Sequence, residues 1–177
     1  RFRDALLRFV GRHQGVDLSV IEGDRAQLLG DLRRGRADVA ILLGPHDEPG
    51  LDRLALWQEA GMVALPERHP LAGADLVLWQ DLAGETFIVA SRGSGPEVRA
   101  TVQSLLPEGH TAQFAAHDVG REGMFNLVGT GLGVAVLAAS ASGASYPGVV
   151  FRPVGDATGP TMVEVAAYWD PKRDNPV

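Results

Sequence analysis

The clearest local pattern in the chain is an apolar stripe between Asp24 and Gly35. Leu28, Leu29 and Leu32 recur at the spacing of one helix face. Asp24 stands where its carboxylate can accept a hydrogen bond from a free amide of the first turn, and Gly35 stands where a left-handed residue ends a helix. The pattern predicts a helix that is capped at both ends.

Two apolar segments flank this helix and predict strands. In Val16–Ile21, apolar residues alternate with polar ones, which is typical of a strand. Val39–Leu43 is a continuous apolar run, which favours a strand covered on both faces. Strand, helix and strand in this order form a βαβ unit, so we expect a parallel sheet.

Other segments predict more helices and strands around this unit. An apolar stripe that includes Phe2 and Phe9 predicts a helix at the start of the chain. The remaining apolar runs predict strands at residues 62–65, 87–90, 111–116, 134–137, 149–153 and 162–169. We interpret the polar, proline-containing segment at residues 66–73 as a crossover between two parts of the chain. The second part repeats the βαβ order of the first.

Two helices of the second part have predicted caps. Ser94 and Glu97 have the spacing of a capping box, and Pro96 is compatible with the first turn of that helix. Asp118 is placed to cap the next helix, which we expect to continue through Val128.

Composition and charge argue against several classes of protein. The 177 residues suffice for one large domain or two small lobes. The net charge of −6 argues against a domain that binds DNA phosphates by itself. The absence of cysteine excludes disulfides and suits a cytoplasmic protein. No apolar run is long enough to span a membrane, and the sequence has no signal-peptide pattern.

Motifs give no reason to expect a cofactor, a metal or a catalytic site. Gly129, Gly131 and Gly133 follow a predicted helix and precede a predicted strand, whereas a dinucleotide fingerprint has the opposite order. We interpret them as a tight turn. The histidines are scattered without the spacing of a metal site. No nucleophile elbow or phosphate-binding loop occurs, so we do not expect an enzyme.

Three segments together resemble the effector-binding domain of LysR-type transcriptional regulators. The first is the helix end Leu32–Gly35, which is followed by a small residue, an aspartate and an apolar strand. The second is the His-Pro-Leu-Ala sequence at residues 69–72, after an apolar strand. The third is the glycine-rich stretch at residues 128–137. Their order and spacing match the family over nearly the whole chain.

The resemblance implies an α/β fold of two Rossmann-like lobes, similar to type II periplasmic binding proteins, joined by two crossover strands. Residues 1–66 and 160–177 would form lobe I, and residues 67–159 would form lobe II. In the family a first strand precedes the N-terminal helix and a closing helix follows the last strand, and this sequence matches neither.

The resemblance also implies a function with its partners. A small-molecule effector, polar or carboxylate-bearing, would bind in the cleft between the lobes and shift the balance between lobe arrangements. DNA would be bound only through a helix-turn-helix domain outside this chain. The protein would be a cytoplasmic homodimer or tetramer without a membrane partner. Phe2, Phe9 or the helix at residues 98–105 could supply apolar surface to the dimer.

Two helix starts are predicted to contact the effector. Ser91, Arg92, Gly93 and Ser94 precede a helix whose free amides attract an anion, and Arg92 can add a charge-assisted bond. The alternative is simple capping by Ser94. Asp24 occupies a position where the family often has Ser or Thr for an effector carboxylate. Because Asp24 would repel an anion, it suits an effector amine or hydroxyl, or it serves only as a cap.

Loops after two strands add three candidates. His46 follows the strand at residues 39–43, and His117 and Asp118 occupy the equivalent place in the second lobe. Ligand loops usually lie at such carboxyl ends of parallel strands. His117 could face the cleft and respond to pH near neutrality. The alternatives are solvated histidines and an Asp118 that serves only as a cap.

The sequence leaves two alternative functions. An exported solute-binding protein has the same architecture, but it would need a signal segment or an anchor. An enzyme on this scaffold would need titratable groups that converge between the lobes, and the sequence does not indicate such a set.

Overall fold

The computed structural model describes residues 2–44 and 46–173. Its α-helices are α1 (Phe2–Arg12), α2 (Arg25–Arg34), α3 (Gly95–Leu105) and α4 (Arg121–Gly129). Its short 3-10 helices are η1 (Pro70–Gly73), η2 (Trp79–Leu82) and η3 (Ala139–Ser142). Its strands are β1 (Ala40–Leu43), β2 (Asp52–Pro66), β3 (Val77–Leu78), β4 (Thr86–Ala90), β5 (Gln113–His117), β6 (Ala135–Ala138), β7 (Val149–Asp156), β8 (Gly159–Pro160) and β9 (Met162–Trp169).

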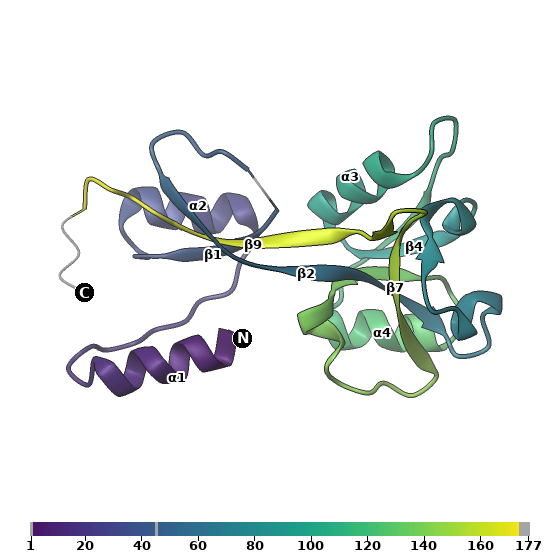
Figure 1. Cartoon of the computed structure of the whole chain (residues 1–177), viewed down its shortest axis with the longest axis horizontal. Helices are drawn as coiled ribbons and strands as arrows, with labels where there is room; N and C mark the ends of the chain where they lie inside the picture. Colours follow the sequence, from purple (N-terminus) through teal and green to yellow (C-terminus); the bar gives the residue numbers. More distant parts are fainter. Residues whose placement is uncertain (1, 45, 174–177) are drawn as a thin grey trace.

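Two lobes are joined by a pair of long strands, β2 and β9 (Figure 1). From Asp52 to Ala60, β2 pairs antiparallel with β9, which also pairs with β1 in the first lobe. From Gly61 to Pro66, β2 pairs instead with β6 and β7 of the second lobe. The predicted two-lobe α/β fold with two crossover strands is therefore confirmed.

The first crossing lies earlier in the chain than we expected. The strand predicted at residues 62–65 is only the end of β2, which begins at Asp52. The chain changes lobes within β2 rather than in the segment at residues 66–73. Residues 61–66, predicted to belong to lobe I, pair with strands of the second lobe. The early half of β2 mixes charged and apolar residues, and apolar side chains such as Leu54 are exposed there.

The second lobe has the predicted βαβ organisation. β4 and β5 pair in parallel, and α3 connects them. Val134, just before β6, forms a parallel bridge with Phe87 of β4. The strands predicted at residues 87–90, 111–116 and 134–137 correspond to β4, β5 and β6.

Helices cover both faces of the second-lobe sheet. Val63 and Leu65 of β2 belong to a core cluster that includes Val102 of α3. Ala64, between them, belongs to a second cluster with Phe125 of α4. Because successive residues of a strand point to opposite faces, β2 carries apolar side chains on both sides here. The continuous apolar sequence of this segment follows from that double burial.

The first lobe has a smaller core and differs from the predicted βαβ unit. Leu29 and Leu32 of α2 pack on β1 and β9, where Leu42 and Tyr168 are buried. β1 is antiparallel to β9, so the expected parallel pairing is wrong. β1 is also buried on one face only, since Ile41 is 39% exposed.

The strand predicted at Val16–Ile21 is absent, and this segment has no regular structure. Its four apolar side chains, including Val20 at 62% exposed, face solvent. A strand needs a neighbour for its backbone hydrogen bonds, and no described strand pairs with this segment. The alternating sequence is therefore compatible with a strand, but no described strand is available to pair with it.

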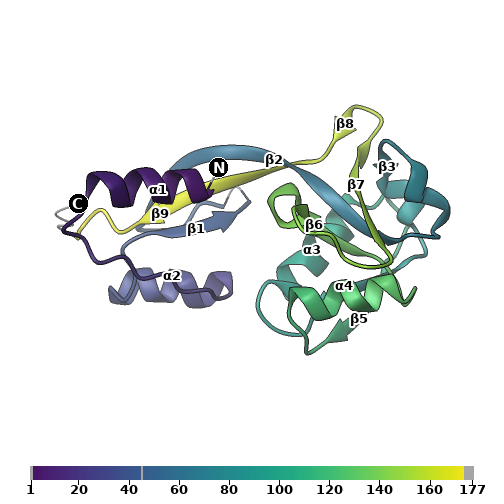
Figure 2. The same ribbon diagram turned by 90° about the horizontal axis from the view of Figure 1, so that it is seen from below.

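The predicted N-terminal helix forms as α1, but it buries none of its residues. Figure 2 shows α1 and α2 on opposite sides of β1. Phe2 is 42% exposed, so the apolar stripe of α1 stays a candidate surface for a partner.

The predicted side-chain caps form in α2 only, although α4 continues through Val128 as predicted. Asp24 caps α2 by accepting the backbone N–H of Gln27 at 2.8 Å, and Gly35 ends the helix with φ 70°. Ser94 makes no side-chain cap, because it already has a helical conformation instead of the extended one that capping requires. Asp118 does not cap α4, because that helix begins later and Gly120 is its N-cap.

The glycines at residues 129–133 form the turn from α4 to β6. Gly131 has φ 85°, which favours glycine. At Gly133 a Cβ atom would lie 2.2 Å from the carbonyl oxygen of Thr86, because this turn passes directly against β4. The interpretation of these glycines as a tight turn is confirmed.

Asp31 of α2 is a nearly buried acid, 5% exposed, with two arginine partners. Arg36 Nε donates to Asp31 Oδ1 at 2.9 Å, and Arg34 Nη2 donates to the same oxygen at 3.4 Å. The hydrogen bond from Arg36 lowers the pKa of Asp31, more than burial raises it, and Arg34 lowers it further. The ionised form is therefore favoured in the folded state.

Asp31→Asn is expected to weaken the acid sensitivity of folding. Because the folded-state pKa is depressed, the contribution of Asp31 is present above the ordinary aspartate pKa of about 4 and is lost as the pH falls through the folded-state value. Urea unfolding at several pH values measures the free energy of unfolding of both proteins. Arg36→Gln is the matched variant and should reproduce most of the change. Parallel pH curves for wild type and Asp31→Asn would contradict this account.

Candidate functional site

The starts of α2 and α3 face each other across the two lobes (Figure 1). Arg25, the first residue of α2, and Glu97, in the first turn of α3, form an ion pair with Nε and Oε1 3.1 Å apart. The Arg25 side chain is 13% exposed and the Glu97 side chain 48%. This contact links the lobes through side chains, in addition to the strands β2 and β9.

Other groups of the first lobe hold Arg25 in place. Its Nη2 donates to the carbonyl oxygen of Leu43 at the end of β1, and its Nη1 lies 3.7 Å from Glu48 Oε1. Nε and Nη1 are buried and have no well-formed hydrogen bond among the described residues. Two guanidinium nitrogens of Arg25 could therefore donate hydrogen bonds to a better-placed carboxylate.

Sequence reasoning missed Arg25, although a signal was present. A helix start carries partial positive charge, so a cation in the first turn is unfavourable there. Arg25 follows the cap residue Asp24 directly, whereas the arginines Arg33 and Arg34 lie at the favourable end of α2. A cation at the unfavourable end indicates acidic partners outside the helix, and these are Glu48 in the same lobe and Glu97 in the other lobe.

The structure brings four of the predicted site residues together in the second lobe. Arg92 Nε donates to Asp118 Oδ1 at 2.9 Å, and this links the loop after β4 to the loop after β5. The backbone N–H of Ser91 donates to the carbonyl oxygen of His117 at 2.8 Å. Asp118 therefore balances the charge of Arg92 instead of capping a helix.

The other predicted residues have simpler surroundings. Gly93 has φ 66° and bends the loop before α3. The carbonyl oxygen of Ser94 accepts a hydrogen bond from the Val98 backbone N–H in the first turn of that helix. The carbonyl oxygen of His46 accepts a hydrogen bond from the Tyr168 hydroxyl at 2.8 Å. Asp24 is engaged as the cap of α2. None of these observations tests effector binding, so the site assignment stays a prediction.

A pocket of about 560 Å³ lies beside the crossover strands. It is lined by residues of α1, β2, β9 and η3, namely Phe2, Trp57, Gln58, Glu59, Ala60, Ala139, Ser140 and Met162. The volume is in the usual range for small-molecule sites. The pocket joins both lobes and includes none of the residues that the sequence predicted for the site.

Glu59 fixes one wall of this hinge pocket. Its side chain is nearly buried, and it accepts hydrogen bonds from the Ser140 backbone N–H at 3.0 Å and from the Ser140 hydroxyl at 2.9 Å. These bonds attach β2 to η3. Glu59 and Ser140 are 81 residues apart, so no local pattern could pair them.

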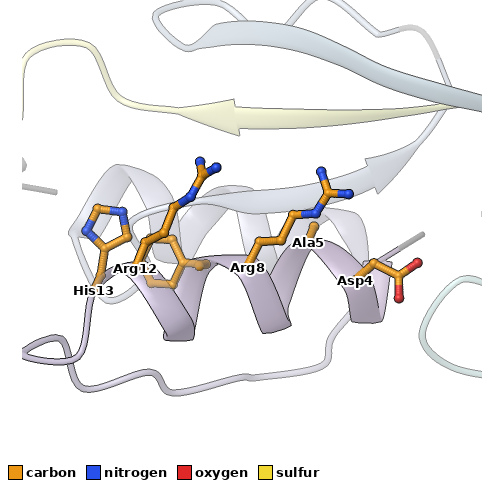
Figure 3. A pocket seen from close by; sticks show the side chains of 6 residues that line it. Asp4, Ala5, Arg8, Arg12 and His13 are labelled. Atoms are coloured by element: carbon orange, nitrogen blue, oxygen red, sulfur yellow. The ribbon is translucent and has the colours of Figure 1, made fainter.

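A second hollow, of about 500 Å³, runs along α1 and is lined only by α1 residues and His13. In Figure 3, Arg8 and Arg12 point the same way from the helix, with Asp4 and His13 toward its two ends. Because one helix and its end supply all the lining residues, this hollow does not connect the lobes.

The described residues provide neither a metal-binding cluster nor a membrane-spanning helix. No group of three or more acidic or histidine side chains is arranged to hold a metal ion. No helix within the described ranges is long and apolar enough to cross a bilayer.

Comparison with known proteins places this chain in a family. The family model described as the LysR substrate binding domain matches residues 1–177. The chain belongs to the LysR substrate binding domain family. The resemblance seen in the sequence is therefore confirmed. Curated relatives of this LysR domain are transcriptional regulators, which favours the regulator over the exported binding protein.

Relatives of this LysR domain include the transcriptional regulator TtuA of Agrobacterium vitis. The two are 29% identical over 94% of this chain and 58% of TtuA. The Hca operon transcriptional activator HcaR of Escherichia coli is 32% identical over 70% of this chain and 42% of HcaR. The chain thus spans about half the length of these relatives.

Solved structures support the same fold. HinK, a LysR family transcriptional regulator from Pseudomonas aeruginosa, matches with a TM-score of 0.73 and 25% identity, covering 96% of this chain and 58% of HinK. A full-length OxyR variant from Pseudomonas aeruginosa matches with a TM-score of 0.81 and 21% identity, covering 99% of this chain and 60% of that chain.

Proposed function

We propose that this LysR domain is the ligand-sensing part of a DNA-binding transcriptional regulator. A small molecule, polar or carboxylate-bearing, would bind between the lobes and favour one lobe arrangement over another. The observation that carries this proposal is the Arg25–Glu97 ion pair, because it links the two lobes between facing helix starts. A ligand carboxylate that pairs with Arg25 would compete with Glu97 and thereby alter the contact between the lobes.

The predicted residues would complete this site. Ser91, Arg92, Gly93 and Ser94 lie next to the start of α3, in which Glu97 takes part in the inter-lobe ion pair. On the facing lobe, Asp24 precedes Arg25, and His46 lies in the loop after β1.

Glu97→Gln is expected to shift the balance of lobe arrangements away from the one described here. Because Glu97 is about half exposed, we expect a contribution near that of surface ion pairs, up to about 1 kcal/mol, which corresponds to a population change of about fivefold. The sequence has no cysteine, so spin labels at Asp38→Cys and Glu108→Cys report the inter-lobe distance specifically. Glu122→Gln, in the first turn of α4, is the matched control and should leave the distance distribution unchanged.

The same labelled protein tests the function. Small organic acids that raise Tm are expected to bind and to change the inter-lobe distance. After incubation with the protein, the acids should be recovered chemically unaltered. Binding that leaves the distance unchanged would contradict the sensing mechanism, and turnover of the ligand would indicate an enzyme.

We also propose that the complete protein is a cytoplasmic homodimer or tetramer that binds DNA through a domain outside this chain. The regulator relatives, which are about twice as long as the matched region, support this proposal. The natural gene should encode about 90 further residues with a helix-turn-helix pattern before this domain. A cleaved apolar signal segment in that place would instead identify an exported binding protein. Light scattering of the complete protein that gives only a monomer would exclude the oligomer.

A further inference from the structure

An unused hydrogen-bond donor belongs to a residue that lines the hinge pocket. Trp57 lines the pocket, and its Nε1–H is buried without an acceptor among the described residues. Tryptophan Nε1 can only donate, so no alternative orientation of the hydrogen satisfies it. Buried N–H groups nearly always have a partner, so an exception beside a pocket calls for an acceptor that the described residues do not supply.

A β-bulge determines where Trp57 stands. Ala55 of β2 lies opposite Ala166 of β9, and a regular ladder would then place Leu56 opposite Val165. The register shifts between Ala55 and Trp57, so Trp57 takes that place instead. Bulges are frequent near functional sites, where they redirect a side chain. Here the bulge brings a large aromatic donor to the pocket beside the hinge.

The remaining lining residues limit the chemistry of a ligand. Phe2 and Met162, which are 42% and 53% exposed, provide accessible apolar surface. Glu59 is the one charged residue among those that line the pocket, and its carboxylate is occupied by Ser140. A second carboxylate close to it would be repelled, whereas a neutral group would not.

We propose that the hinge pocket binds an uncharged aromatic group whose hydrogen-bond acceptor takes the Nε1–H of Trp57. Carbonyl oxygens and heteroaromatic nitrogens are suitable acceptors. This inference rests on the proposed function and deepens it, because it gives the inter-lobe ligand a neutral aromatic portion at the hinge. The carboxylate of such a ligand would pair with Arg25, outside this pocket.

Nuclear magnetic resonance of the tryptophan indole groups tests the proposal with three probes. Benzamide is neutral and has a carbonyl acceptor, toluene has no acceptor, and benzoate is an anion. Benzamide is expected to shift the Trp57 Nε1–H resonance saturably and to bind about three- to tenfold more tightly than toluene. Benzoate should bind less tightly than benzamide.

Matched variants separate the hydrogen bond from aromatic packing. Trp57→Phe should lower benzamide affinity about three- to tenfold, to the level of toluene, and leave toluene binding unchanged. Trp79→Phe is the control, because Trp79 already donates to Thr161 Oγ1 at 2.8 Å. Glu59→Gln should raise the affinity for benzoate relative to benzamide. Equal affinities for benzamide and toluene, or benzamide binding that survives Trp57→Phe, would overturn the proposal.

The outcome also distinguishes this proposal from the sensing function. If organic acids change the inter-lobe distance while benzamide leaves the Trp57 resonance unmoved, the sensing function stands and the hinge assignment fails. If benzamide binds at Trp57 and no tested acid changes the inter-lobe distance, the hinge assignment is supported and the sensing mechanism fails.

Discussion

Replacing Gly95 with alanine is expected to lower the free energy of unfolding by about 1–3 kcal/mol or more and to displace the start of α3. A Cβ atom at this position would lie 1.7 Å from the carbonyl oxygen of Ala90, and 2.7 Å from its carbonyl carbon. Both contacts are far below van der Waals separation, and backbone atoms cannot move away as a flexible side chain can. The first turn of α3 would have to move away from the end of β4.

This displacement should also reach the inter-lobe contact. Glu97 lies two residues after Gly95 in the first turn of α3, so a shift of that turn changes its distance from Arg25. Urea unfolding measures the stability, and the spin-label distance measures the lobe arrangement.

Gly143→Ala is the matched control for Gly95→Ala. Gly143 is exposed and has φ −72°, and the nearest atom to its added Cβ is 4.0 Å away. It should therefore be nearly neutral in both measurements. A Gly95→Ala protein with unchanged stability would show that α3 can slide over β4 at little cost.

Much of the second lobe could be predicted from the sequence because β4 is buried on both faces and α3 connects it to its neighbour β5. Phe87–Ala90 is a continuous apolar run whose parallel neighbour β5 follows after one helix. Local periodicity and connection rules are then sufficient. The first lobe is different, because β1 pairs with β9, more than a hundred residues later in the chain. Local sequence gives no indication of such a partner, and the strand at Val16–Ile21 failed for the same reason.

The candidate site was predictable only where one loop or one helix end defines it. The loop at Ser91–Ser94 and the cap Asp24 are local features. Arg25 and Trp57 acquire their importance from distant partners, Glu97 across the lobes and the bulge against β9. The caps proposed for Ser94 and Asp118 failed because a suitable residue type does not fix the backbone conformation or the first residue of a helix.

Phe125→Ala is expected to destabilise the second lobe by about 3–5 kcal/mol. Phe125 of α4 is fully buried, and its ring centroid lies 4.7 Å from that of Tyr146 and 5.2 Å from that of Phe151. Truncation removes these aromatic contacts and leaves a cavity between α4 and the sheet. Asn126→Ala, at the next and exposed position of α4, is the control and should cost little.

Hydrogen exchange should show that this loss stays mainly within one lobe. The cluster around Phe125 contains residues of the second lobe, whereas the first lobe has a separate cluster around Leu32 and Tyr168. Phe125→Ala should therefore reduce amide protection in β4 and β6 much more than in β1. Equal loss of protection in both lobes would mean that β2 and β9 transmit unfolding between them. Local loss would instead leave the two lobes as separate packing units, which a hinge between them requires.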